Sequence, residues 1–160
     1  MSQLHIRPAT EQDIDLILHF VRELAIYEKA EHEVKATPEH VRRTLFCANP
    51  SVFGLICEIE GKAVGFAMVD AEEGCVFAAF VLPEWEGRGL GRRLMAEAEA
   101  SLFRRHETIW LETDGRSRAS GFYAHLGWKP TATDGNGDVR FEKKRPRPAL
   151  SLSGPGEKPF

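Results

Sequence analysis

The sequence has few cysteines, and none are paired in the way that binds zinc. Its three cysteines, Cys47, Cys57 and Cys75, are odd in number, and no two are separated by two residues. This spacing favours neither a disulfide framework nor a zinc site. We therefore expect reduced thiols in or near the core and no bound metal ion.

The sequence also lacks a long apolar run and an excess of positive charge. No apolar stretch is long enough to cross a bilayer, and the first residues lack the basic-then-apolar order of a secretion signal. The formal net charge of -3 at pH 7 argues against nucleic acid as a partner, because phosphate binding usually requires a basic face. We expect a cytoplasmic protein that binds neither a membrane nor nucleic acid.

What is present fits one globular domain. The chain has 160 residues, of which 42% are hydrophobic and 28% are charged, enough for a single core. We expect this domain to cover residues 1–145 and a flexible tail, rich in Ser, Gly and Pro, to cover residues 146–160. The basic run Lys143 to Pro148 is expected to be a solvated end, with contact to an anionic ligand as the alternative.

Apolar periodicity predicts an α/β fold. Helices are expected after the capping pair Thr10 and Asp13, after Thr37-Pro38, from Gly89, and over 118–126. Strands are expected at 4–7, 52–59, 63–69, 76–82, 108–112, 129–133 and 138–143. A helix lies between the strands 76–82 and 108–112, so these two should be parallel. Because the first of them is apolar throughout, it is expected to be covered on both faces.

A glycine-rich turn, Glu86 to Gly91, follows the apolar strand and opens a helix. Its glycines allow close approach of a ligand, and the first turn of the helix presents unpaired N–H groups to an anion. Arg88, Arg92 and Arg93 add positive charge. The turn therefore predicts a pyrophosphate site, with a plain turn before an amphipathic helix as the alternative. A Rossmann fold is disfavoured because antiparallel strands precede the turn, and a P-loop is excluded by the missing Gly-Lys-Ser/Thr.

With these residues, the sequence resembles the GCN5-related N-acetyltransferase (GNAT) superfamily from Leu4 to Lys143. The family signature is Gln or Arg, two residues, Gly, one residue, then Gly or Ala, and Glu86 departs from it at the first position. The resemblance implies a mixed sheet of about six to seven strands flanked by about four helices. It also implies acetyl-CoA as co-substrate, contacted by Glu86, Gly87, Arg88, Gly89, Leu90, Gly91 and Arg92.

A second stretch, Ala119 to Trp128, resembles the family's helix that ends in Tyr, a spacer and Gly-aromatic. It implies further donor contacts from Ala119 and Phe122, and from Arg116, which stands where relatives often have Asn. By the same resemblance, a backbone N–H near Phe80 and Val81 holds the acetyl carbonyl.

The resemblance also implies roles in acetyl transfer by direct attack of an amine. Tyr123 is the expected proton donor to the leaving thiolate, with an ordinary core tyrosine as the alternative. Glu112 is the candidate base, and Glu31 and Glu33 are candidate acceptor contacts; a solvated surface role is the alternative for each. Dimers are common in the family, so a homodimer is an open expectation.

The amino-terminal part, from Ile6 to Val34, is similar to the diamine acetyltransferases. Those enzymes carry acidic residues on the central strand before its Phe-Val, whereas this chain has Phe77-Ala78-Ala79. We therefore expect a less cationic primary amine, on a small molecule or a peptide, as acceptor. A polyamine acetyltransferase and a non-catalytic acyl-CoA sensor remain alternatives.

Overall fold

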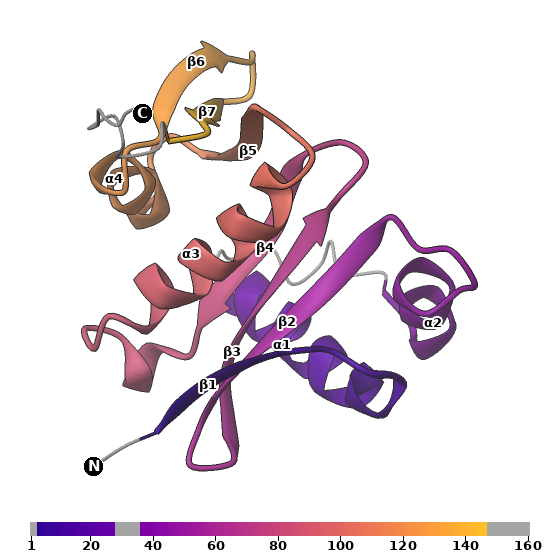
Figure 1. The fold of residues 1–160 in the computed structure, drawn as a ribbon. Helices are drawn as coiled ribbons and strands as arrows, with labels where there is room; N and C mark the ends of the chain where they lie inside the picture. Colours follow the sequence, from indigo (N-terminus) through magenta and orange to yellow (C-terminus); the bar gives the residue numbers. More distant parts are fainter. Residues whose placement is uncertain (1–2, 28–35, 147–160) are drawn as a thin grey trace, which may run out of the picture.

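The computed structural model describes residues 3–27 and 36–146. These residues form one mixed sheet of seven strands in the order β1-β2-β3-β4-β5-β7-β6 (Figure 1). The strands are β1 Leu4–Pro8, β2 Val52–Ile59, β3 Lys62–Asp70, β4 Cys75–Val81, β5 Thr108–Asp114, β6 Lys129–Thr133 and β7 Asp138–Lys144. All neighbouring strands pair antiparallel except β4 and β5. These two are parallel, as predicted from the helix that lies between them in the sequence.

Four α-helices flank the described part of the sheet. They are α1 Ile14–Tyr27, α2 Pro38–Leu45, α3 Leu90–Phe103 and α4 Arg118–His125, with short 3-10 turns at Glu11–Asp13 and Pro83–Trp85. In Figure 1, α1 lies behind the sheet and α3 in front of it. Phe20 of α1 and Val41 of α2 pack with Phe66 of β3, whereas Met95 of α3 and Tyr123 of α4 pack on the other side of the sheet. The predicted α/β architecture is confirmed. None of the helices in the described ranges is both long and apolar enough to cross a membrane.

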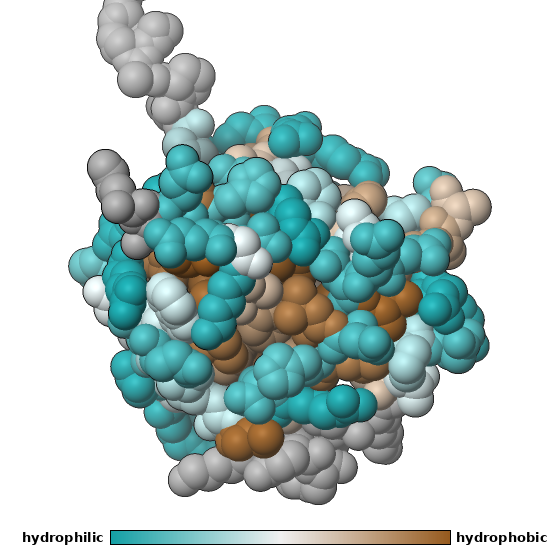
Figure 2. Space-filling view, turned by 90° about the horizontal axis from the view of Figure 1, so that it is seen from below, coloured by the Kyte–Doolittle hydropathy of each residue, from teal (hydrophilic) through white to brown (hydrophobic). Residues whose placement is uncertain are grey.

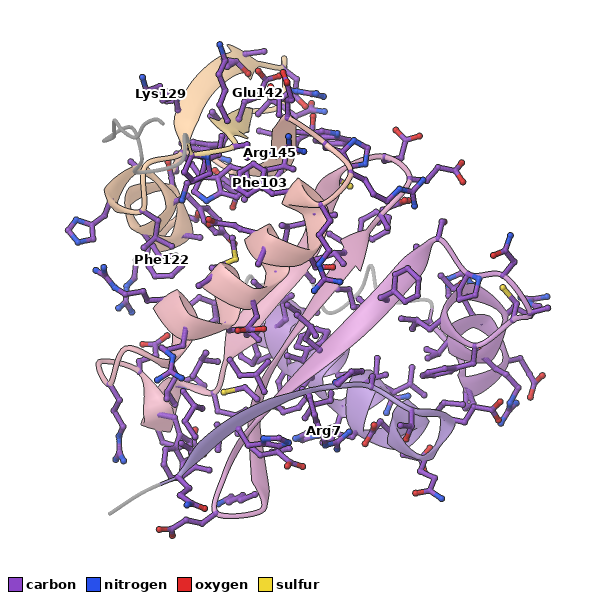
Figure 3. The ribbon with its side chains drawn as sticks, viewed as in Figure 1. Arg7, Phe103, Phe122, Lys129, Glu142 and Arg145 are labelled. Carbon is purple, nitrogen blue, oxygen red and sulfur yellow. The ribbon has the colours of Figure 1, made fainter. Side chains whose placement is uncertain are left out.

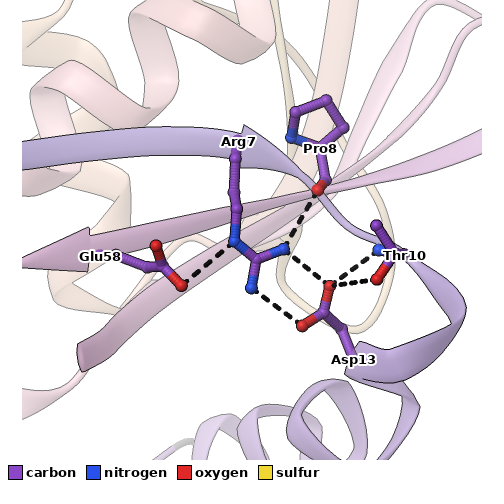
Figure 4. Close-up of polar contacts among 5 residues, drawn as sticks. All are labelled: Arg7, Pro8, Thr10, Asp13 and Glu58. Atoms are coloured by element: carbon purple, nitrogen blue, oxygen red, sulfur yellow. Dashed lines mark hydrogen bonds and ion pairs between the residues drawn. The ribbon is translucent and has the colours of Figure 1, made fainter. Parts of the chain in front are cut away.

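A partly buried ion pair fixes the start of α1 to the edge of the sheet (Figure 4). The Arg7 guanidinium on β1 donates to both carboxylate oxygens of Asp13, at 2.8 and 2.9 Å, and to Glu58 on β2 at 3.1 Å. Asp13 also accepts the Thr10 backbone N–H at 2.7 Å, so the predicted capping pair is present. One carboxylate therefore both caps the helix and joins it to two strands.

Strand β4 differs from its prediction, because it is not covered along its whole length. Its register against β3 shifts between Met68 and Val69, which leaves Phe77 as an extra residue without a directly opposed partner. Such a bulge bends a strand and turns its side chains aside. The Phe77 side chain is 58% exposed. Periodicity along β4 could not reveal this, because the bulge depends on the register with which β4 pairs with β3.

Long-range contacts correct one further expectation, that the basic run from Lys143 is a solvated end. Lys143 is not a solvated residue, because its Nζ donates to Glu99 at 2.8 Å and to the Leu126 carbonyl at 2.8 Å. Arg145 donates to the carbonyls of Phe103 and His106 at the end of α3 (Figure 3). These residues close the fold and are not a free basic end.

The cysteines are free thiols, as expected, but they are not all in the core. Cys57 and Cys75 are buried, whereas Cys47 is exposed. Burial raises the pKa of Cys57 above its ordinary value and raises that of Cys75 to about 11.

Candidate active site

Strands β4 and β5 separate soon after they meet. Their only register pair in the described structure is Cys75 with Trp110, although each strand continues for several residues. On the other side of β4, the Leu82 N–H donates to the Val64 carbonyl of β3 at 2.9 Å. Backbone N–H groups alternate in direction along a strand, so the N–H of Val81 points away from β3 and into the gap beside β5. The gap therefore holds a backbone donor that the sheet does not use.

The glycine turn lies at the same end of β4, after the 3-10 turn Pro83–Trp85. Gly87 and Gly89 have φ values of 81° and 78°, in the left-handed region that disfavours a side chain. Apart from the adjoining residues of the chain, no atom of the described residues lies within 4 Å of the position that a Cβ would take at either glycine. The turn is thus open on the side where these glycines leave space for a ligand.

Helix α3 begins with free backbone donors. The Arg93 N–H donates to the Gly89 carbonyl at 3.2 Å, which closes the first turn of the helix. The N–H groups of Leu90, Gly91 and Arg92 precede this bond and have no acceptor within the described residues. Together with the positive end of the helix dipole, they give this turn the backbone donors that an anion requires.

Two charged side chains of the turn, Arg88 and Glu86, each contact another side chain. The Arg88 guanidinium lies over the Trp85 ring, 4.5 Å from its centre, and Lys62 lies 5.9 Å from the same ring. Glu86 forms an ion pair with Arg118 of α4, with 3.6 Å between Oε1 and Nη2. Sequence reasoning missed both Trp85 and Arg118. The sequence did contain a signal for Arg118. Glu86 places a negative charge in a turn that should bind an anion, and a nearby positive side chain would offset that charge.

Helix α4 packs against the first turn of α3. A Cβ at Gly91 would lie 3.3 Å from the Phe122 ring, so glycine allows this close approach, and Figure 3 shows Phe122 between the two helices. Ala119 packs on the core beneath α4. Tyr123 is buried there, with its ring centre 6.3 Å from those of Trp128 and Phe141.

Other predicted site residues lie at the surface. Arg116 is paired with Asp114, at 3.2 Å between Nε and Oδ1, and this contact lowers the pKa of the Asp114 carboxyl. Glu112 on β5 is exposed and opposite Arg140 in register. Since Leu111 faces α3 and α4, Glu112 points to the other side of the sheet. Glu31 and Glu33 lie outside the described residues, so the predicted acceptor loop has no structural account.

Figure 2 views the molecule from below, the side on which Figure 1 has the start of α3. Apolar residues line a hollow in the middle of this face, and hydrophilic side chains surround it. A hollow of this kind suits a ligand with a charged end and an apolar body. Within residues 3–27 and 36–146, no three His, Cys, Asp or Glu side chains are grouped so that they could hold a metal ion.

Comparison with known proteins agrees with this geometry. Residues 50–130 match the family model described as the acetyltransferase (GNAT) domain. The chain belongs to the GNAT family. A thialysine N-epsilon-acetyltransferase from Sus scrofa is 31% identical over 89% of this chain and 94% of its own length, and the Mus musculus enzyme of that name is 29% identical over the same shares.

Solved structures support the fold. A paia N-acetyltransferase from Thermoplasma acidophilum, in complex with coenzyme A, has a TM-score of 0.74 at 19% identity, covering 89% of this chain and 99% of that one. An acetyltransferase from Thermus thermophilus has a TM-score of 0.70 at 20% identity, covering 89% and 97%. The expectation of an acetyl-CoA-dependent N-acetyltransferase is confirmed by the family, and the open turn before α3 fits the phosphates of that co-substrate.

Proposed function

We propose that the chain transfers the acetyl group of acetyl-CoA to the primary amine of a small molecule or peptide, by direct attack within a ternary complex. The observation that carries the proposal is the gap between β4 and β5. It leaves the Val81 N–H without a strand partner, close in sequence to the anion-binding turn. The carbonyl oxygen of an acetyl group can accept the Val81 N–H, and the pyrophosphate of coenzyme A can accept the N–H groups of the turn.

In this proposal, acetyl-CoA is bound mainly by backbone groups of the protein. The pyrophosphate accepts the N–H groups at the start of α3, and Gly87 and Gly89 leave it room. The residues proposed to contact the rest of acetyl-CoA, through backbone or side chain, are Phe80, Val81, Glu86, Arg88, Leu90, Gly91, Arg92, Arg116, Ala119 and Phe122. Of these, Arg116 would have to leave Asp114 before it could contact a phosphate.

Acetyl transfer then needs one hydrogen bond to the acetyl carbonyl oxygen and two proton transfers. The amine nitrogen bonds to the carbonyl carbon, and the Val81 N–H stabilises the negative charge that grows on the carbonyl oxygen. As the carbon–sulfur bond breaks, Tyr123 gives a proton to the sulfur, and the tyrosinate then regains a proton from solvent. With ordinary pKa values of about 10 for a tyrosine and about 8.5 for a thiol, the first transfer is uphill by a factor of only about 30, so it can accompany bond cleavage. Glu112 takes the proton that the amine loses, directly or through water.

The end of β4 favours an acceptor that is not a polycation. The strand Cys75–Val81 carries no carboxylate, and the exposed Phe77 presents an apolar ring instead. The mammalian relatives are named for the N-epsilon group of thialysine, which is a primary amine. We therefore propose amino acids of this type, or peptides with such an amine, ahead of polyamines.

An acceptor panel tests the proposal. Thialysine, lysine, a simple monoamine and spermidine are each incubated with acetyl-CoA, while thiol release is followed and products are weighed by mass spectrometry. We expect acetylated product with thialysine and a lower kcat/KM with spermidine. Higher kcat/KM with spermidine would favour a polyamine acetyltransferase, and tight acetyl-CoA binding without turnover of any amine would favour a sensor.

The proton donor has its own test. Tyr123→Phe keeps the packed ring and removes the hydroxyl, so kcat should fall by about a hundredfold while the affinity for acetyl-CoA is kept. An unchanged kcat at every pH would refute the assignment of Tyr123.

A further inference from the structure

Glu99 is a buried carboxylate that the proposed mechanism does not use. It lies on α3 and is 9% exposed. Its Oε2 accepts the indole N–H of Trp128 at 3.0 Å, and its Oε1 accepts Lys143 Nζ of β7 at 2.8 Å. The same Nζ donates to the Leu126 carbonyl at 2.8 Å. One carboxylate therefore joins α3, β7 and the segment that ends α4.

This network extends to Tyr123 in two ways. Through the backbone, the N–H groups of Leu126 and Trp128 donate to the Tyr123 carbonyl at 3.0 and 3.1 Å. Through the side chains, the Trp128 ring packs edge-on against the Tyr123 ring, with 6.3 Å between centres and 64° between planes. Since Trp128 is fully buried, it cannot move without disturbing both contacts.

Stability alone does not account for this arrangement. A buried ion pair is often no more stabilising than apolar side chains of similar volume, because both charges lose their water. The three hydrogen bonds in which Glu99 accepts or Lys143 donates do supply direction, because they fix the indole plane and the end of α4.

We propose that Glu99 and Lys143 are positioning residues for acetyl transfer, which hold the Trp128 ring and the end of α4 so that the Tyr123 hydroxyl is aligned with the leaving sulfur. The inference rests on the proposed role of Tyr123 as proton donor. Misalignment affects a proton transfer more than acetyl-CoA binding, because the pyrophosphate turn precedes the first residue of α3, whereas Glu99 lies in the last turns of that helix. The expected signature is a lower kcat with little change in the KM for acetyl-CoA.

A double-mutant cycle on kcat is the test. Glu99→Gln keeps an acceptor for the Trp128 N–H but removes the charge that Lys143 pairs with, and Lys143→Met removes the other partner. Each should lower kcat by about tenfold in the full-length protein. In the Tyr123→Phe background, the same changes should lower kcat by less than about twofold, since there is no hydroxyl left to align.

Matched controls separate positioning from folding. Glu97→Gln and Lys144→Met change the exposed neighbours on the same helix and strand, and should leave kcat unchanged. The double variant Glu99→Met/Lys143→Met removes both charges, so it should keep its melting temperature within a few degrees and still show the low kcat.

The outcomes distinguish the two proposals. If the losses from Glu99→Gln and Tyr123→Phe multiply, or if folded Glu99→Gln keeps full kcat, the positioning role is wrong while the proton donor stands. If Tyr123→Phe alone leaves kcat unchanged, the proton donor is wrong and the alignment proposed here falls with it.

Discussion

Arg7 and Asp13 form a two-pronged ion pair, with Nη1 and Nη2 of the guanidinium at 2.8 and 2.9 Å from the two carboxylate oxygens. Mainly through this contact, the pKa of Asp13 is held at about 2, below its ordinary value of 3.8. The same contact raises the pKa of Arg7. The pair links β1 to the first turn before α1, so its loss should loosen the edge of the sheet (Figure 4).

The lowered pKa of Asp13 predicts acid sensitivity. Because the folded state prefers the ionised carboxylate, its contribution is present above pH 4 and is lost as the pH falls towards 2. At pH 7, Asp13→Asn should lower the free energy of unfolding by about 2 kcal/mol. Urea unfolding at pH 7 and at pH 3 measures both values.

The exposed Asp15 on α1 provides the control. Asp15→Asn should change the free energy of unfolding by less than about 0.5 kcal/mol at either pH. If Asp13→Asn keeps the same dependence on pH as the unmodified protein, the ion pair is not the source of acid sensitivity.

Gly89 should be intolerant of any side chain. At a φ of 78°, Gly89→Ala is strained and should cost about 1 kcal/mol of stability. Its methyl group would also stand in the open space where the pyrophosphate is proposed, so the Kd for acetyl-CoA should rise roughly tenfold or more. Isothermal titration calorimetry and thermal unfolding measure these two effects.

Gly121 offers the matched control, because it lies within α4, has open space around its Cβ position and has no left-handed φ. Gly121→Ala should be neutral or stabilising by up to about 1 kcal/mol. Equal affinity for acetyl-CoA in Gly89→Ala and the unmodified protein would contradict the pyrophosphate assignment.

The sequence predicted those parts of the site that depend on local chemistry. A backbone position with a left-handed conformation favours glycine in any protein. The turn at Gly87 and Gly89 could therefore be recognised before any contact was known. The capping residues Asp13 and Thr37 were equally clear, because the side chain of each accepts a backbone N–H three positions away.

The features that could not be predicted depend on distant partners. Lys143 stands in a basic run, and its partial burial is set by Glu99, which is 44 positions away. Phe77 belongs to an apolar run, and its exposure follows from the register shift opposite Met68. In both cases the local pattern was correct, but another element determined the outcome.

The three cysteines should react at very different rates. Burial, with added repulsion from Asp70 and Glu73, raises the pKa of Cys75 to about 11, so roughly one molecule in a thousand is a thiolate there at pH 8. Cys57 is also buried with a raised pKa, whereas Cys47 is exposed. A thiol reagent should label Cys47 first in the folded protein and all three cysteines in denaturant. Equal labelling rates before unfolding would contradict the burial of Cys57 and Cys75.

Glu86 should weaken donor binding, because its carboxylate occupies Arg118 at the edge of the phosphate turn. Glu86→Gln frees Arg118 and removes a negative charge, so the Kd for acetyl-CoA should fall, by up to about fivefold for a pair this exposed. Arg118→Gln should raise the Kd and reduce its dependence on salt. Calorimetry at low and high ionic strength measures both variants, with Glu84→Gln, an exposed neighbour, as the control. Weaker binding in Glu86→Gln would mean that the ion pair holds the turn in its binding conformation, and that its structural role outweighs the repulsion between the carboxylate and the phosphates.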